Sequence, residues 1–201
     1  MTNEQQLEMI QKKWNVFNDL IKRIDEDRQP AARQIVEFFG ERLATCPADP
    51  RHDAPGSYPG GLVSQAIGLT KAMKKMKDTF NLEDVDDGSI VIVGLFHELG
   101  KVGTLDQEYF IPENDNWKRQ NLGAYYKVNE KISKLSIQER TLFILQHFGL
   151  QLTEEEFIAI RGQSKDPGWA EHRLAPTYDP MISVLLRSAR DIFVRAIINP
   201  E

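Results

Sequence analysis

Ser89-Ile90-Val91-Ile92-Val93-Gly94-Leu95-Phe96 is the most hydrophobic run in this 201-residue sequence, and its secondary structure decides the fold class. Its β-branched residues favour a buried strand. A buried helix segment can have the same composition, and periodicity does not distinguish the two when every position is apolar. Taken from these residues alone, both interpretations stay open.

The segments before this run predict amphipathic helices. From Asn3 to about Asp25, apolar side chains recur at steps of three and four, which is the spacing of one helix face. On this helix, Phe17 is expected either to pack onto the helical bundle or to contact a partner in an assembly. Pro30 opens a second helix, and the turn residues from Arg51 to Gly61 form a loop before a third helix begins near Leu62.

The C-terminal half contains clear helix-start signals. Ser136-Ile137-Gln138-Glu139 and Thr153-Glu154-Glu155-Glu156 both have the spacing of a capping box, and each precedes an apolar run. Asp179-Pro180 provides an N-cap residue followed by proline, which is typical of the first turn of a helix. These signals predict three further helices.

The segment between these halves predicts a small hairpin-like insertion. Glu108 to Ile111 and Ala124 to Val128 flank a polar, Asn-rich stretch. We find no internal repeat and no linker long enough to separate two domains. The chain is therefore expected to fold as one unit, with N-terminal helices (residues 1–43) packed on a helical domain (residues 44–201).

Composition excludes several classes of protein. With 41% hydrophobic and 27% charged residues, the chain has an ordinary globular composition, and no run approaches the roughly 18 apolar residues of a membrane span. A net charge of −5 gives no overall field that would attract nucleic acid or an anionic membrane. The one dense local patch, Lys71, Lys74, Lys75 and Lys77, is interpreted as a solvated helix face rather than a phosphate-binding patch. The start of the chain lacks the pattern of a secretory signal, and the single Cys46 cannot form an internal disulfide, so we expect a cytoplasmic location.

Two motifs in the sequence resemble the HD-domain superfamily of metal-dependent phosphohydrolases, most closely its compact members from phages. They are Tyr58-Pro59-Gly60-Gly61-Leu62 and Gly94-Leu95-Phe96-His97-Glu98-Leu99-Gly100-Lys101, with further matching stretches at 44–48, 125–128 and 152–161. The resemblance implies an all-α, HD-domain-like bundle. It therefore predicts that the hydrophobic run is the central buried helix rather than a strand.

The metal-ligand pattern of this family is changed at most of its positions. Family members hold a divalent cation with one His, a His-Asp doublet and a distant Asp. The corresponding residues here are Gln65, His97-Glu98 and Arg190, and arginine is a permanent cation that cannot ligate a metal. Asp191 is adjacent, but one helical position rotates its side chain by about 100°. We therefore expect no metal cofactor; a rearranged site would use His97, Glu98 and Asp191 to hold Mn, Ni, Fe or Mg.

We predict instead a pocket held together by ion pairs. Arg190 is expected to fill the space of the cation, to pair with Glu98 and to hydrogen-bond Gln65, because a buried carboxylate without a partner is costly. The side chains expected to contact a phosphorylated ligand around this pocket are Arg51, His52, Gln65, Lys101, Arg161 and Arg190. Alternatively, His97 is an ordinary core histidine and Lys101 a solvated lysine at a helix end.

Two functions follow from the resemblance and its changes. The first is a catalytically inactive HD-like protein that binds a host or viral partner protein or a small phosphorylated, nucleotide-like ligand. In that case the segment from Glu108 to Val128, with Trp117, is the candidate partner-facing surface. The second is a divalent-metal phosphohydrolase that acts on nucleotides or short oligonucleotides through a rearranged His97/Glu98 site. Assembly into a homo-oligomer is left open.

Overall fold

The hydrophobic run forms a buried helix. In the computed structural model, which describes residues 3–51, 53–163 and 179–198, this helix is α4 (Asp87–Phe96). The Asp86 carboxylate accepts a hydrogen bond from the Ser89 amide at 2.7 Å and so caps its N-terminus. Residues 88–96 are all buried, and packing on every side overrides the β-propensity of the run. The prediction of an all-α fold is confirmed.

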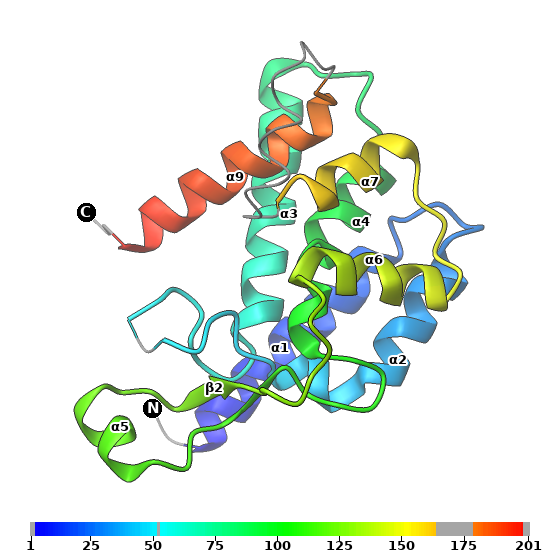
Figure 1. Ribbon diagram of the computed structural model, residues 1–201. Coiled ribbons are helices and arrows are strands. Elements are labelled where there is room, and N and C mark those ends of the chain that lie inside the picture. The colour runs from blue at the N-terminus through cyan, green and yellow to red at the C-terminus, as the bar shows by residue number, and fades with distance from the viewer. Residues whose placement is uncertain (1–2, 52, 164–178, 199–201) are drawn as a thin grey trace.

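Two long helices pack against α4. They are α3 (Gly61–Phe80) and α9 (Met181–Ile198), and Figure 1 shows α9 crossing the upper part of α3. Gly94 permits the close approach of α4 to α3, because a Cβ at this position would lie 2.9 Å from the Cα of Thr70. Within the described residues, none of the helices combines the length and the apolar character needed to cross a membrane.

The N-terminal helices α1 (Asn3–Ile21) and α2 (Gln29–Thr45) share one hydrophobic core with the rest of the bundle. Phe17 of α1 is only 1% exposed, and its ring meets that of Phe96 edge-on at 6.0 Å. Phe17 therefore packs onto the bundle. The first helix ends at Ile21, earlier than the predicted Asp25, and turns occupy much of the segment from 22 to 28.

Both predicted capping boxes are present. At the start of α6 (Ile137–His147), the Ser136 hydroxyl and the Glu139 carboxylate each accept a hydrogen bond from the other's backbone amide. Thr153 and Glu156 form the same arrangement at α7 (Glu154–Arg161). Glu156 is fully buried and also accepts two hydrogen bonds from Arg28, at 2.8 and 2.9 Å. This ion pair ties the segment between α1 and α2 to α7.

The predicted insertion is a short antiparallel hairpin with a helix at its tip. Strands β1 (Phe110–Pro112) and β2 (Tyr126–Val128) pair with Ile111 opposite Lys127. Between them lies α5 (Asn116–Asn121), which the sequence analysis did not predict and whose N-terminus is capped by the Asp115 carboxylate. Figure 1 shows this insertion at one end of the bundle, and Trp117 within it is 62% exposed.

The contact between α3 and α4 predicts the effect of enlarging Gly94. Gly94→Ala should lower the free energy of unfolding by about 1–3 kcal/mol, because the new methyl group meets helix backbone that cannot move aside. Gly88→Ala on the same helix is the comparison: the nearest atoms to its Cβ belong to the carboxylate groups of Asp25 and Asp86, which are side-chain ends rather than helix backbone, although Asp86 also caps α4. We expect Gly88→Ala to lose less stability than Gly94→Ala in urea denaturation, and equal losses in the two variants would contradict this account of the packing.

Candidate functional site

An open cleft of about 670 Å³ lies at the C-terminal end of α4. Its walls come from the loop at 48–55, from α3, from α9 and from Gln163, which follows α7. Its lining is rich in charge. Four cationic side chains and four carboxylates contribute to it, namely Arg51, Lys101, Arg187 and Arg190 with Asp49, Asp53, Glu98 and Asp191.

His97 lies at the end of α4 and is 2% exposed. Its Nδ1 is 3.2 Å from the Gly94 carbonyl oxygen, whereas its buried Nε2 has no hydrogen-bond partner among the described residues. Burial lowers the pKa of His97 and so favours the neutral imidazole. The predicted alternative, an ordinary core histidine, therefore accounts for its burial but leaves one ring nitrogen unexplained.

The carboxylate of Glu98 is shared between two cations. It is 6% exposed; its Oε2 lies 2.7 Å from the Lys101 ammonium and its Oε1 lies 3.3 Å from the Arg190 guanidinium. Burial alone would raise the pKa of Glu98, but the charge and hydrogen bond of Lys101, together with the charge of Arg190, lower it to about 2. The predicted contact between Arg190 and Glu98 is present, and Glu98 is ionised at neutral pH.

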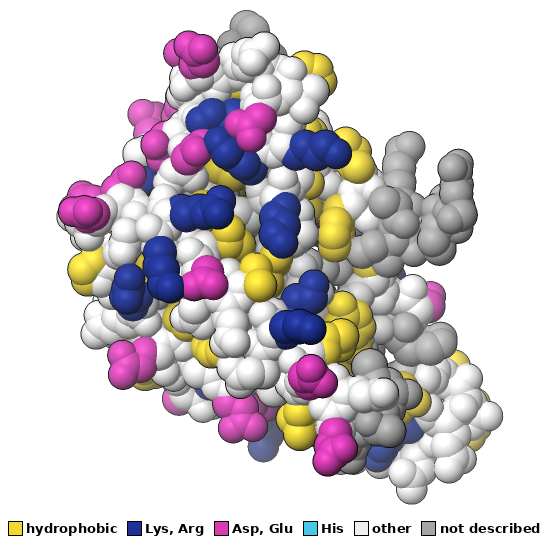
Figure 2. Space-filling model, turned by 180° about the vertical axis from the view of Figure 1, so that it is seen from behind, with side chains coloured by type: hydrophobic (Ala, Val, Ile, Leu, Met, Phe, Trp, Pro, Cys, Tyr) yellow, Lys and Arg dark blue, Asp and Glu magenta, His cyan; other side chains and the backbone are white. Residues whose placement is uncertain are grey.

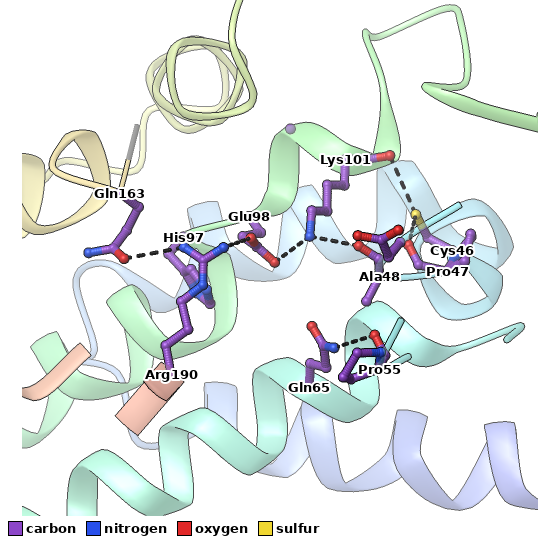
Figure 3. Close-up of polar contacts among 12 residues, drawn as sticks. Cys46, Pro47, Ala48, Pro55, Gln65, His97, Glu98, Lys101, Gln163 and Arg190 are labelled. Atoms are coloured by element: carbon purple, nitrogen blue, oxygen red, sulfur yellow. Dashed lines mark hydrogen bonds and ion pairs between the residues drawn. The ribbon is translucent and has the colours of Figure 1, made fainter. Parts of the chain in front are cut away.

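Lys101 is the closer of the two partners, and the solvated-lysine alternative is wrong. The 3₁₀ helix η1 (Leu99–Val102) places this residue three positions after Glu98, with its side chain only 12% exposed. Its ammonium also donates a hydrogen bond to the Ala48 carbonyl oxygen at 2.7 Å. Figure 3 shows the resulting series of contacts, which runs from the loop at 48 through Lys101 and Glu98 to α9.

The amide partner of Arg190 is Gln163 rather than the predicted Gln65. The guanidinium donates to the Gln163 side-chain oxygen at 3.4 Å, whereas the Gln65 amide group donates to the Pro55 carbonyl oxygen at 2.7 Å. Gln65 still lines the cleft, where it fixes the loop before α3. The contact of Gln163 with Arg190 was not predicted from the sequence, because it depends on how α7 lies against α9.

Of the other predicted site residues, some line the cleft and some do not. Arg51 lines the cleft but is well exposed, and it forms an ion pair with Asp49 at 2.9 Å. Asp191 also lines the cleft and is exposed. Arg161, in the last turn of α7, is exposed and is absent from the described lining. His52 lies outside the described residues.

The potential metal ligands around Glu98 are few within the described residues, and Glu98 itself already faces two cations. Among residues 3–51, 53–163 and 179–198, no three His, Cys, Asp or Glu side chains are placed to share one ion. Both oxygens of Glu98 already face cations, so an added metal would be repelled by Lys101 and Arg190. What this donor set can offer instead is a cationic surface held in place by a buried carboxylate.

The two ion pairs of Glu98 should differ in their contribution to stability. Lys101→Met should lower the free energy of unfolding by about 3 kcal/mol, because it removes the nearer and more buried cation from a buried carboxylate. Arg190→Gln should cost only about 1 kcal/mol, since this pair is longer and the guanidinium is 30% exposed. Lys134→Met, at an exposed position, is the control in urea denaturation. If Arg190→Gln lost as much stability as Lys101→Met, or more, Lys101 would not be the main partner of Glu98.

The low pKa of Glu98 predicts a dependence of stability on pH. The folded pKa of about 2 lies below the unfolded value, so the stabilisation is complete above the unfolded pKa and is lost as the pH falls towards the folded one. Between about pH 5 and pH 2, the stability advantage of the wild type over Glu98→Gln should shrink by on the order of 3 kcal/mol. Parallel curves for the two proteins in urea denaturation across this range would contradict the assignment.

Comparisons with protein-family models, with curated proteins and with solved structures find no match to this chain. What the cleft can bind is therefore inferred from its own side chains. These are the buried Glu98, the two cations that share it, and the exposed charges on its rim.

Proposed function

We propose that this protein is a non-catalytic, HD-like helical protein whose cleft binds a small nucleotide-like ligand. The observation that carries the proposal is the cation pair on Glu98 at the wall of an open cleft of about 670 Å³. In an HD-like scaffold this is where a metal would face a phosphoryl group, and here the guanidinium of Arg190 supplies the positive charge. Clefts of this volume suit ligands of nucleotide size.

Arg190 retains capacity to bind an anion. A guanidinium has five N–H donors, and the two contacts of Arg190 within the described residues are long, at 3.3 and 3.4 Å. Arg187 lies one helical turn earlier on α9 and also lines the cleft. Arg187 and Arg51 form exposed ion pairs with Asp179 and Asp49, and such pairs exchange readily with other anions. A phosphate can therefore be held between these arginines.

The rest of the lining favours a nucleotide over a simple phosphate. The carboxylates of Asp53 and Asp191 would repel a bare anion, but they are good acceptors for sugar hydroxyl groups. Leu69 and Phe193 provide an apolar wall against which a base can lie. A ligand with a phosphate, hydroxyl groups and a flat apolar ring matches these three kinds of surface.

A partner protein is the second candidate, and the exposed hairpin favours it. Trp117, Leu122 and Tyr125 are between 53% and 62% exposed, which is unusual for large apolar side chains gathered in one insertion. This candidate becomes the better proposal if the titration described next finds no nucleotide binding.

Calorimetric titration tests the proposal with nucleoside monophosphates, nucleoside triphosphates and a cyclic dinucleotide. We expect saturable binding of at least one of them, weakened about tenfold or more in Arg190→Gln, which removes the central cation. Lys134→Gln, a charge change away from the cleft lining, should bind like the wild type. Binding that is unchanged in Arg190→Gln would place the ligand elsewhere.

The same ligands and short single strands, incubated with Mn, Ni, Fe or Mg, test the phosphohydrolase alternative. We expect no turnover above the buffer control. Turnover that disappears in folded His97→Ala and His97→Gln would replace the proposal with an enzyme that uses His97 and Glu98. The unpartnered Nε2 of His97 is the feature of the structure that favours this alternative.

A further inference from the structure

A second concave surface lies between α1, α3 and the first turns of α4. This groove has a volume of about 830 Å³ and is separated from the cleft by α3, since Leu69 lines the cleft and Thr70 lines the groove. Figure 2 shows a face of the molecule on which Lys and Arg side chains surround patches of apolar surface. The proposed binding of a nucleotide uses none of the residues that line this groove.

The floor of the groove is apolar. Val16 and Leu20 come from α1, and Ile90 and Val91 come from α4. Leu20, Ile90 and Val91 are buried and Val16 is half-buried, so the hydrocarbon from which an entering apolar group would displace water belongs mostly to Val16.

The carboxylates on the rim of the groove are already neutralised. Asp19 pairs with Lys22 at 2.7 Å, and Asp78 pairs with Lys74 at 3.0 Å. Asp87 is held by both Lys74 and Lys77. None of these carboxylates is left to attract a further cation.

Three cations on the same rim have no such partner. Arg23, Lys71 and Lys75 are exposed, and within the described residues no ion pair joins any of them to a carboxylate. In a chain with a net charge of −5, this is a local excess of positive charge beside an apolar floor. An ordinary solvated lysine face is convex, whereas these three residues lie at the rim of a groove with an apolar floor.

We propose that this groove binds a small anionic amphiphile, with its apolar body on the floor and its phosphate, sulfonate or carboxylate head among Arg23, Lys71 and Lys75. Charge alone would attract inorganic phosphate, and the floor alone would attract neutral hydrocarbon. The juxtaposition of the two favours a molecule that has both parts. The volume of the groove lies within the range of single-ligand sites.

The test measures binding of decyl phosphate below its critical micelle concentration. Binding is detected as displacement of the fluorescent probe 8-anilinonaphthalene-1-sulfonate from the full-length protein. The wild type should bind decyl phosphate saturably, whereas decanol and inorganic phosphate should displace the probe far less well. The triple variant Arg23→Gln, Lys71→Gln and Lys75→Gln should bind decyl phosphate about tenfold or more weakly. Vesicles with anionic lipid provide a further arm, and binding to vesicles without binding of monomeric decyl phosphate would overturn the proposal.

The matched control is the triple variant Arg119→Gln, Lys131→Gln and Lys134→Gln, which removes one arginine and two lysines from exposed positions away from the groove. It should bind like the wild type. Val16→Trp, which fills the floor and keeps every charge, should abolish binding while its thermal unfolding stays cooperative. Equal losses in the two triple variants, no saturable binding by the wild type, or undiminished binding in Val16→Trp would each overturn the proposal.

Discussion

The negative charge of a carboxylate buried at the end of an apolar helix has to be stabilised by nearby cations, and the contacts around Glu98 provide them. Lys101 supplies it locally, because the turn of η1 brings the ammonium back to a residue three positions earlier. Arg190 supplies it from the last helix, 92 residues further along the chain. A buried ion without partners costs several kcal/mol. Most of the compensation therefore comes from Lys101, and the weaker contact of Arg190 adds to the apolar packing that holds α9 in the bundle.

The position of Lys101 depends in turn on how η1 is held. The carbonyl oxygen of Gly100 accepts a hydrogen bond from the fully buried Arg140 at 3.1 Å, and the Gly100 amide donates to the Thr141 hydroxyl at 2.8 Å. Both partners belong to α6, and a side chain at Gly100 would meet the backbone of Ile137. The cation that faces Glu98 is thus positioned by a helix that contributes no side chain to the described cleft lining. The side chain of Lys101 is therefore held by Glu98 and Ala48 on one side, and its backbone turn is held by α6 on the other.

Sequence patterns were sufficient where structure is local and insufficient where it is tertiary. The capping boxes at Ser136 and Thr153 use backbone groups three residues away, so their spacing alone predicted two helices correctly. The helical state of the run in α4 followed only from the family resemblance, since its β-branched residues favour a strand. The contact of Arg190 with Glu98 was expected because the family resemblance placed both residues at one site and because a buried charge without a partner is costly. Its second contact, with Gln163, depends on the packing of α7 against α9, and no spacing in the sequence encodes that.

The cleft and the groove lie on either side of α3 and differ in their electrostatics. The cleft balances its cations with carboxylates and so suits a ligand that has both an anionic group and hydrogen-bond donors. In the groove the carboxylates are neutralised by lysines, and three cations are left beside an apolar floor. A movement of α3 relative to α4 is one way in which the two sites could be coupled. The close contact of Gly94 with Thr70 leaves no room for such a movement inward, because helix backbones already touch there. We therefore expect no coupling through this contact between the two proposed binding surfaces.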